Sequence, residues 1–238
     1  MKTFLALTAL AIGIGAGGSH AQKVASLGFN GMDPRSGKAP TQAVILFHGY
    51  SQRGVAMKSL ADTLARRLPD TAFIFNDGPI PAEPGRSWYA GRGVDSETAK
   101  ASRAMAKQLA IDTVTKVSEG LNVPHDKIVV VGFSQGGGMA LDAGTCSTPD
   151  VKAVVSLAGV LTVGDCSKEE SGPAASVLIV YNDGDPVVRP DRIQAFQEQV
   201  AKDGYESKLE TYSGTTHWPV PAGLRLAQDF IVAQLGGK

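Results

Sequence analysis

The sequence predicts an α/β protein whose central sheet is mostly parallel and carries helices on both faces. Short apolar runs alternate with longer stretches in which apolar residues recur at helical spacing, a pattern typical of parallel strands joined by helices. The chain has 238 residues, of which 43% are hydrophobic and 19% are charged, as in a globular protein with a sizeable core. Neither an internal repeat nor a linker-like composition divides it, so we expect a single domain over residues 22–238.

Residues 1–21 have the pattern of a secretory signal peptide. Lys2 supplies a positive charge, the apolar run FLALTALAIGIGA follows, and Ser19 and Ala21 are small residues suited to cleavage after Ala21. The apolar run is shorter than the roughly 20 residues that span a bilayer, so we expect no stable membrane anchor. The run also contains GIGAGG, but no strand precedes this dinucleotide-like pattern and no nucleotide site is predicted. We therefore expect a secreted or periplasmic protein.

Strands and helices begin to alternate after this segment. Ala43–His48 is almost continuously apolar, as in a strand buried on both faces. Apolar residues between positions 57 and 68 recur at helical spacing, and Thr71–Asp77 is the next expected strand. The Pro- and Gly-rich segment Gly78–Asp95 is too long for a simple connection, and such loops are often functional. A helix over Ser96–Gly120 follows and ends at a glycine.

The alternation continues in the second half of the chain. The strand Ile128–Val131 leads through an abrupt turn into a helix that extends to about Gly144. Apolar runs at Ala153–Gly159 and Ser176–Tyr181 predict two further buried strands, separated by a loop over residues 160–175.

The chain closes with a helix, a strand and a final helix. The first helix carries Ile193, Phe196 and Val200 on its apolar face, the strand lies at Ser207–Tyr212, and the last helix runs from about residue 222 to residue 235. Because catalytic groups gather at the carboxyl ends of the strands in such sheets, the residues that directly follow the strands are the candidate catalytic residues.

Ser134 has the sequence environment of a nucleophile. Gly132-Phe133-Ser134-Gln135-Gly136 is a G-x-S-x-G segment between a predicted strand and a predicted helix. A serine in so tight a turn projects its hydroxyl from the sheet edge, and the flanking glycines remove side chains that would collide there. The dipoles of the following helix point toward the reacting oxygen. The alternative is a phosphate-binding loop, but the Lys-Ser/Thr pair of a nucleotide P-loop does not follow.

His217 is the expected base, because a serine hydroxyl is a poor nucleophile without one. His20 lies in the signal segment, His48 ends the first core strand, and His125 enters the nucleophile strand from the opposite edge of the sheet. His217 lies in a loop after the last strand, where the chain order Ser, Asp, His places the base. A loop histidine without a catalytic role is the alternative interpretation.

A carboxylate must fix the tautomer of this base and stabilise the imidazolium that forms. Asp183 and Asp185 both follow the apolar strand that ends at Tyr181. We prefer Asp185, which directly precedes a proline, and interpret Asp183 as a turn former. The resulting order, Ser134, Asp185, His217, is that of the α/β-hydrolase fold.

Two backbone amides are expected to stabilise the oxyanion. One belongs to Gln135, which follows the nucleophile, and the other to the loop after the first core strand, where Tyr50 is the candidate. Gly49 then permits a tight turn and His48 braces it, with a directly catalytic His48 as the alternative.

The chain resembles the phospholipase/carboxylesterase family of α/β-hydrolases, which includes acyl-protein thioesterases. The matching segments are ILFHGYSQRG, RSWYAG, VVVGFSQGGGMAL, GDPVV and THWP, and GFSQGG is the most specific of them. The resemblance implies an α/β-hydrolase fold, a triad of Ser134, Asp185 and His217, and an oxyanion hole made by the amides of Tyr50 and Gln135.

Two departures from the family pattern fall at the expected acyl pocket. Ser51 stands where the family usually has a glycine, and Ala90 follows the Trp88-Tyr89 pair where an aspartate is usual soon after. These positions bear on substrate preference rather than on the triad. Trp88 and Tyr89 themselves either border the acyl or alcohol site or pin the long loop to the core.

The sequence therefore predicts a serine ester hydrolase that forms an acyl-enzyme on Ser134 and acts on short- to medium-chain esters without a metal or organic cofactor. Its 23 Lys and Arg balance 23 Asp and Glu, which argues against a nucleic-acid partner and fits an uncharged or weakly polar ester. The alternatives are a peptidase or acyltransferase on the same fold, and a non-catalytic binding protein that retains it.

The two cysteines, Cys146 and Cys166, form a possible disulfide, because an oxidising compartment favours pairing of an even number of cysteines. The alternative is two unpaired cysteines that act as small apolar residues. Neither belongs to a CxxC motif or a Cys/His cluster, so no metal site is predicted.

Overall fold

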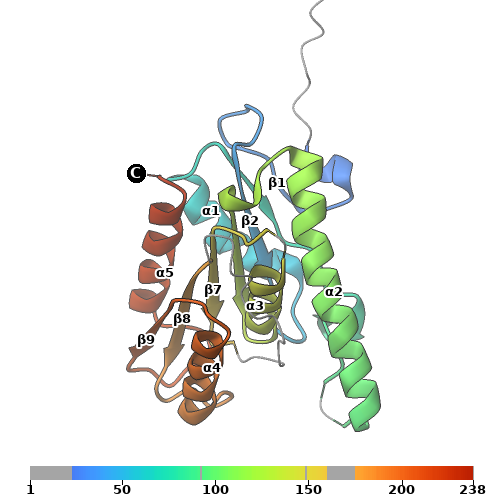
Figure 1. Cartoon of the computed structure of the whole chain (residues 1–238), viewed down its shortest axis with the longest axis vertical. Coiled ribbons are helices and arrows are strands. Elements are labelled where there is room, and N and C mark those ends of the chain that lie inside the picture. The colour runs from blue at the N-terminus through green and yellow to red at the C-terminus, as the bar shows by residue number, and fades with distance from the viewer. Residues whose placement is uncertain (1–22, 92, 148, 160–174, 238) are drawn as a thin grey trace, which may run out of the picture.

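The computed structural model describes residues 23–91, 93–147, 149–159 and 175–237. The predicted signal segment and Cys166 lie outside these residues. One seven-stranded sheet organises the described chain, in the order β1-β3-β2-β6-β7-β8-β9. Its strands are β1 (Gly31–Met32), β2 (Gln42–Phe47), β3 (Thr71–Ile74), β6 (Ile128–Phe133), β7 (Ala153–Leu157), β8 (Ser176–Asn182) and β9 (Ser207–Tyr212). All neighbouring strands are parallel except β1, which runs antiparallel to β3 (Figure 1).

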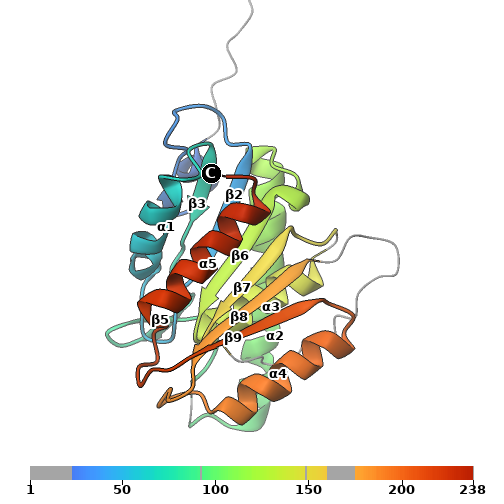
Figure 2. The same ribbon diagram turned by 90° about the vertical axis from the view of Figure 1, so that its left-hand side faces the viewer.

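Helices cover both faces of the sheet. The α-helices are α1 (Lys58–Ala65), α2 (Ser96–Leu121), α3 (Gln135–Cys146), α4 (Pro190–Lys202) and α5 (Pro221–Gln234). Short 3₁₀ helices lie at Val24–Leu27 (η1), Gly54–Met57 (η2) and His125–Lys127 (η3). In Figure 2, α1 and α5 lie on one face of the sheet and α2, α3 and α4 on the other. This arrangement confirms the predicted α/β class. Within the described residues, no helix combines the length and apolarity needed to cross a membrane.

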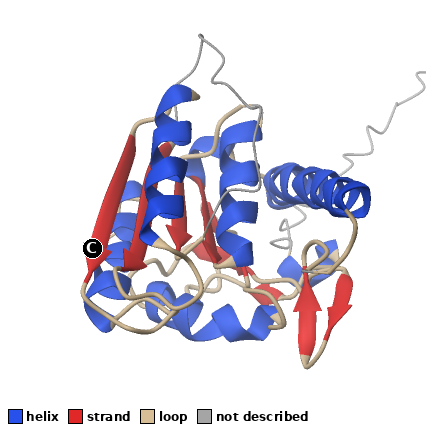
Figure 3. Ribbon diagram, turned by 90° about the horizontal axis from the view of Figure 1, so that it is seen from below, coloured by secondary structure: helices blue, strands red, loops and turns tan. Residues whose placement is uncertain are grey.

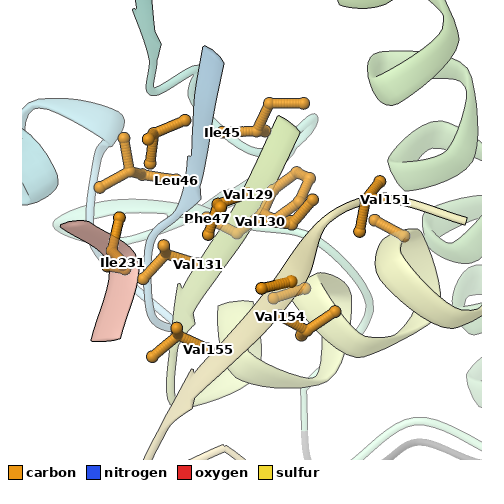
Figure 4. Packing of buried hydrophobic residues seen from close by; sticks show 14 of the residues in the cluster. Ile45, Leu46, Phe47, Val129, Val130, Val131, Val151, Val154, Val155 and Ile231 are labelled. Atoms are coloured by element: carbon orange, nitrogen blue, oxygen red, sulfur yellow. The ribbon is translucent and has the colours of Figure 1, made fainter. Parts of the chain in front are cut away.

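The central strands are almost entirely apolar because both of their faces are covered, and Ser156 of β7 is the polar exception within β6 and β7. Every residue of β6 and β7 is buried. The parallel register places Leu46 beside Val131 and Val131 beside Val155. Figure 4 shows these three side chains with Ile231 of α5 beside them. A sheet with a fully buried centre therefore supports the loops at its carboxyl edge.

The long loop after β3 contains a structure that the sequence does not reveal. Ile80–Ala82 (β4) and Gly85–Ser87 (β5) form a separate antiparallel hairpin, visible apart from the main sheet in Figure 3. A side chain at Gly85 would lie 2.5 Å from the Gln52 carbonyl oxygen, so this glycine lets the hairpin pack against the loop after β2. The long loop after β3 thus contains a folded element.

Candidate active site

The turn between β6 and α3 holds Ser134 in a strained conformation. Its φ of 52° and ψ of −117° lie outside the regions that L-residues favour. A Cβ at Gly132 would lie 1.8 Å from the Gly136 carbonyl oxygen, and one at Gly136 would lie 2.1 Å from the Phe47 carbonyl oxygen. Both contacts are impossible, which is the physical reason for the glycine spacing. The turn is fixed further by a 2.9 Å hydrogen bond from the Ser134 amide to the Leu157 carbonyl.

The carboxyl ends of β6, β8 and β9 bring three predicted side chains together. Nε2 of His217 lies 2.7 Å from Oγ of Ser134, and Nδ1 of His217 lies 2.7 Å from Oδ2 of Asp185. The Asp185 side chain is fully buried, and that of His217 is 19% exposed. The three groups form one hydrogen-bonded line that reaches from the interior to the surface.

The two aspartates after β8 have different partners. Oδ1 of Asp185 accepts hydrogen bonds from the amides of Val187, at 2.7 Å, and Val188, at 3.1 Å. These bonds orient the carboxylate and leave Oδ2 to accept from the imidazole. Asp183 instead accepts a 3.2 Å bond from the Gly214 amide and ties two surface loops together. The geometry agrees with the preference for Asp185.

Asn182 positions the histidine loop, and sequence reasoning missed it. This fully buried residue ends β8. Its Nδ2 donates to the carbonyls of Thr216, at 2.7 Å, and Trp218, at 3.0 Å, the two neighbours of His217. Its Oδ1 accepts a 3.2 Å bond from the Val220 amide. The only indication of this role in the sequence is that a polar residue, Asn182, ends a largely apolar strand.

We expect Asn182→Ala to lower kcat by roughly 10- to 100-fold, because a displacement of about 1 Å at a reacting group has an effect of this size. Unfolding free energy should also fall by about 1–3 kcal/mol, because buried backbone groups lose their partner. Asn76→Ala is the matched control, since Asn76 follows β3 and accepts a 2.7 Å bond from the Asn30 amide away from His217. Steady-state kinetics and urea unfolding check both effects. Equal kcat values in the two variants would contradict the positioning role.

The loop after β2 presents an unused backbone donor. Among the described residues, none accepts a hydrogen bond from the Tyr50 amide. Gln135 is the first residue of α3, where an amide has no partner within the helix. The neighbouring Gly49 amide is occupied by Oε1 of Gln52, at 2.9 Å. The predicted pair of oxyanion donors is therefore available at Tyr50 and Gln135.

Ser51 explains one departure from the family pattern. Its φ is 62°, in the left-handed region that glycine adopts most easily. Its hydroxyl donates a 2.6 Å hydrogen bond to the carbonyl of Glu83 in the β4–β5 turn. The serine thus keeps the backbone conformation of the usual glycine and adds a contact to the hairpin.

His48 is a buried brace. Its Nε2 accepts a 2.9 Å bond from the Gly78 amide, so the proton lies on Nδ1, which donates to the Gly49 carbonyl at 2.7 Å. Burial lowers the pKa of His48 below its usual 6.5, against the opposing effects of the Gly49 carbonyl and Asp77. Because both ring nitrogens are engaged in backbone contacts, His48 supports the loop that carries Tyr50.

Protonation of His48 is expected to destabilise the fold in mild acid. Because its folded pKa lies below 6.5, the unfolded chain binds more protons, and stability falls as the pH drops through 6.5. The loss is at most about 1.4 kcal/mol per pH unit and levels off below the folded pKa. Urea unfolding between pH 7.5 and 5 measures it. His48→Gln should show a shallower slope, and an unchanged slope would exclude His48 as the source.

A cavity of about 620 Å³ opens beside Ser134. It is lined by Tyr50, Tyr89, Ala90, Gly91, Arg103, Ser134, Gln135, Pro186, Val187, Val188 and Arg192. Trp88 and Tyr89 therefore have different positions: one of the two interpretations applies to each. Tyr89 lines the cavity, whereas Trp88 is buried, packs edge-on against Phe47 with ring centroids 5.0 Å apart, and donates from Nε1 to the His48 carbonyl. Trp88 pins the loop and is not part of this pocket wall.

The Gln135 side chain connects the nucleophile turn to that wall. Its Oε1 accepts a 2.9 Å bond from the Trp88 amide, and its Nε2 donates a 3.0 Å bond to the Tyr89 carbonyl. The side chain is buried, so these bonds lie away from bulk water. One residue thus offers its backbone amide to the oxyanion site while its side chain fixes the pocket.

The remaining predictions concern cysteine and metal. Cys146 is the last residue of α3, and Cys166 lies outside the described residues, so their pairing stays a prediction. Within the described ranges, His, Cys, Asp and Glu side chains do not gather in a group of three or more that would suit a metal ion.

Comparison with known proteins identifies the family. Residues 34–235 match the family model described as Phospholipase/Carboxylesterase. The chain belongs to this family. Membership confirms the resemblance found in the motifs, the α/β-hydrolase fold, and an enzyme of the serine hydrolase class that acts on carboxylic esters.

The following relatives of the chain are distant from it in sequence. Acyl-protein thioesterase 1 of Neurospora crassa is 27% identical over 216 residues, which cover 82% of this chain and 87% of that protein. Esterase YpfH of Escherichia coli is 24% identical over 196 residues, covering 82% and 83%. The crystal structure of esterase PE8 superposes with a TM-score of 0.76 at 23% identity, covering 87% of this chain and 98% of that one. At this identity, the structural likeness establishes the fold.

Proposed function

We propose that the protein hydrolyses carboxylic esters through an acyl-enzyme on Ser134, with His217 as general base and Asp185 as the carboxylate that orients it. The observation that carries this proposal is the pair of 2.7 Å contacts joining the three side chains. Since Nδ1–H of His217 donates to Asp185, Nε2 is left as the acceptor that a serine hydroxyl requires.

Acylation follows from this geometry. Nε2 of His217 accepts the hydroxyl proton while Oγ of Ser134 forms a bond to the ester carbonyl carbon. The carbonyl electron pair moves to oxygen, where the amides of Tyr50 and Gln135 donate hydrogen bonds. When the carbonyl re-forms, the bond to the alcohol oxygen breaks and the alcohol leaves with the proton from His217.

Deacylation repeats the same steps with water. A water molecule transfers a proton to Nε2 of His217 as its oxygen attacks the acyl carbon. The second oxyanion collapses, the bond to Oγ breaks, and Ser134 recovers a proton from His217 as the acid departs. These steps require no redox chemistry.

The preferred substrates are proposed to be short- to medium-chain esters. The cavity volume of about 620 Å³ lies within the range of roughly 300–1,000 Å³ typical of small-ligand sites. Pro186, Val187 and Val188 give it an apolar side against which a short chain can pack.

Two measurements test the proposal. A fluorophosphonate probe should label Ser134, and p-nitrophenyl esters graded from acetate to decanoate should be hydrolysed with a maximum at short or medium length. Absence of both labelling and turnover would overturn the proposal and favour a binding protein. Preferential amide cleavage would indicate a peptidase, and preferential transfer to added alcohols would indicate an acyltransferase.

We also propose export with cleavage after Ala21, supported by the charged start, apolar run and small residues of the N-terminal segment. N-terminal sequencing of native protein from the periplasm or medium should then begin at Gln22. Recovery of the intact N-terminus in the cytoplasm alone would contradict export.

A further inference from the structure

The cavity beside Ser134 carries an excess of positive charge. Its described lining includes Arg103 of α2 and Arg192 of α4 but neither aspartate nor glutamate. Ion pairs among the described residues involve neither of these guanidinium groups. The net charge of zero hides this local imbalance, because it sums over the whole chain.

Two cations near these arginines, Arg189 and Lys100, do have acidic partners. Arg189, just before α4, donates from Nε and Nη2 to the two carboxylate oxygens of Asp191, at 2.9 and 2.8 Å. Lys100 on α2 lies 3.6 Å from Glu97. Asp191 and Glu97 are therefore engaged by cations outside the cavity, whereas the two arginines that line it form no ion pair within the described chain and can bind a ligand.

Tyr89 links the two arginines in space. Cζ of Arg103 lies 5.7 Å from the centre of the Tyr89 ring. Burial raises the pKa of Tyr89 to about 12, and the negative charge of Asp142 raises it further, while the positive charges of Arg103 and Arg192 lower it. Both guanidinium groups thus act on the same hydroxyl, which remains protonated at neutral pH and can donate a hydrogen bond.

The two helices reach this site from different parts of the chain. The first turns of α2 and α4 both lie at the carboxyl edge of the sheet, toward the bottom of Figures 1 and 2. Arg192 belongs to the first turn of α4, and Arg103 lies farther along α2. The cavity between them also contains Ser134, so a group bound by the arginines would belong to the molecule that occupies the reaction site.

We propose that the ester substrate carries an anionic group, a carboxylate or a phosphate, that Arg103 and Arg192 bind. The inference rests on the proposed function of Ser134. Guanidinium groups suit planar, bidentate contacts with carboxylate and phosphate oxygens. The apolar side of the cavity accommodates a short chain, and the arginines accommodate a charged end. Net composition favoured an uncharged or weakly polar ester, whereas the two arginines in the cavity lining favour an anionic one.

Matched ester pairs test this proposal. In the first pair, p-nitrophenyl hemiglutarate is compared with p-nitrophenyl valerate, which places the charge on the acyl side. In the second, 4-carboxyphenyl butyrate or 4-(phosphonooxy)phenyl butyrate is compared with phenyl butyrate, which places the charge on the alcohol side. At low ionic strength, the wild-type enzyme should prefer the anionic member of at least one pair by about 25-fold in kcat/KM, taking about fivefold for each exposed ion pair. The preferred pair shows where the charge lies, and the two butyrates distinguish carboxylate from phosphate.

Variants assign the preference to the two arginines. The double variant Arg103→Gln/Arg192→Gln should reduce the ratio of kcat/KM for the anionic and neutral esters to about one, chiefly through KM. Arg189→Gln and Lys107→Gln remove charges of the same helical regions outside the cavity lining, and they should retain the wild-type ratio. Added salt should weaken the preference of the wild-type enzyme, because exposed charges are screened.

The outcomes separate this inference from the proposed function. Turnover of neutral esters with a ratio near one in every pair would overturn the anionic substrate and leave the hydrolase intact. A ratio that the double variant leaves unchanged would also overturn it. Absence of turnover for all esters, together with absence of fluorophosphonate labelling, would overturn both proposals.

Discussion

Ser134→Ala is expected to lower kcat for ester hydrolysis by about 10⁵–10⁶-fold, the size of effect found when the nucleophile of a Ser-His-Asp site is removed. Without Oγ, the 2.7 Å contact to Nε2 of His217 is lost and no acyl-enzyme can form. The amides of Tyr50 and Gln135 remain, so weak catalysis above the rate in water is still expected. Initial rates with an aryl ester and fluorophosphonate labelling measure the loss.

A second substitution at the same position tests the cause. Alanine keeps the unfavourable φ of 52°, whereas glycine adopts it without a Cβ penalty. Strain of this kind costs on the order of 1–3 kcal/mol, and the greater freedom of glycine in the unfolded chain offsets part of the gain. Ser134→Gly should therefore be as inactive as Ser134→Ala but should unfold at a higher temperature. Near-native turnover in either variant would refute a nucleophilic Ser134.

The parts of the fold that were predictable are those in which burial leaves a local pattern. The strands β6 and β7 show as almost continuous apolar runs in the sequence because helices cover both faces of the sheet. β1 has only two residues and therefore shows no periodicity. Its place depends on Gly31, where a Cβ would lie 2.1 Å from the Phe73 carbonyl oxygen. Such a backbone approach between distant segments has no local pattern in the sequence.

The same distinction applies to the site. Ser134 was predictable because the steric requirement of its turn falls on glycines two residues away. Chain order along the sheet indicated His217 and a carboxylate after β8, and the preference for Asp185 over Asp183 rested on the proline that follows it. Asn182 and the side chain of Gln135 act on backbone groups 34 and 47 residues away, at Thr216 and Trp88, and only the fold shows which groups they meet.

The positive charge of the pocket could not be predicted from the sequence, because it too depends on contacts between distant segments. Arg103 and Arg192 belong to different helices, and each is an ordinary surface cation in the sequence. Their common position beside Ser134 depends on how α2 and α4 pack at one edge of the sheet. Net composition averages such features away, so it is a poor guide to the chemistry of a substrate.

Asp185→Asn is expected to lower kcat by about 10³–10⁴-fold through the tautomer of His217. The amides of Val187 and Val188 donate to one side-chain oxygen, so an asparagine must keep its carbonyl there. Its NH₂ group then faces Nδ1 of His217 and can only donate, which forces the imidazole proton onto Nε2. That nitrogen can no longer accept the hydroxyl proton of Ser134. Steady-state kinetics with a neutral aryl ester measure the loss.

Asp183→Asn is the matched control, because it makes the same change two residues away. Its carbonyl oxygen can still accept the bond from the Gly214 amide, and nothing in that contact depends on charge. We expect kcat within a few-fold of wild type. Because both variants remove one negative charge after the same strand, a general electrostatic effect would lower both rates alike. A large loss in Asp183→Asn with little loss in Asp185→Asn would instead assign the orienting carboxylate to Asp183, against the observed 2.7 Å contact between Asp185 and His217.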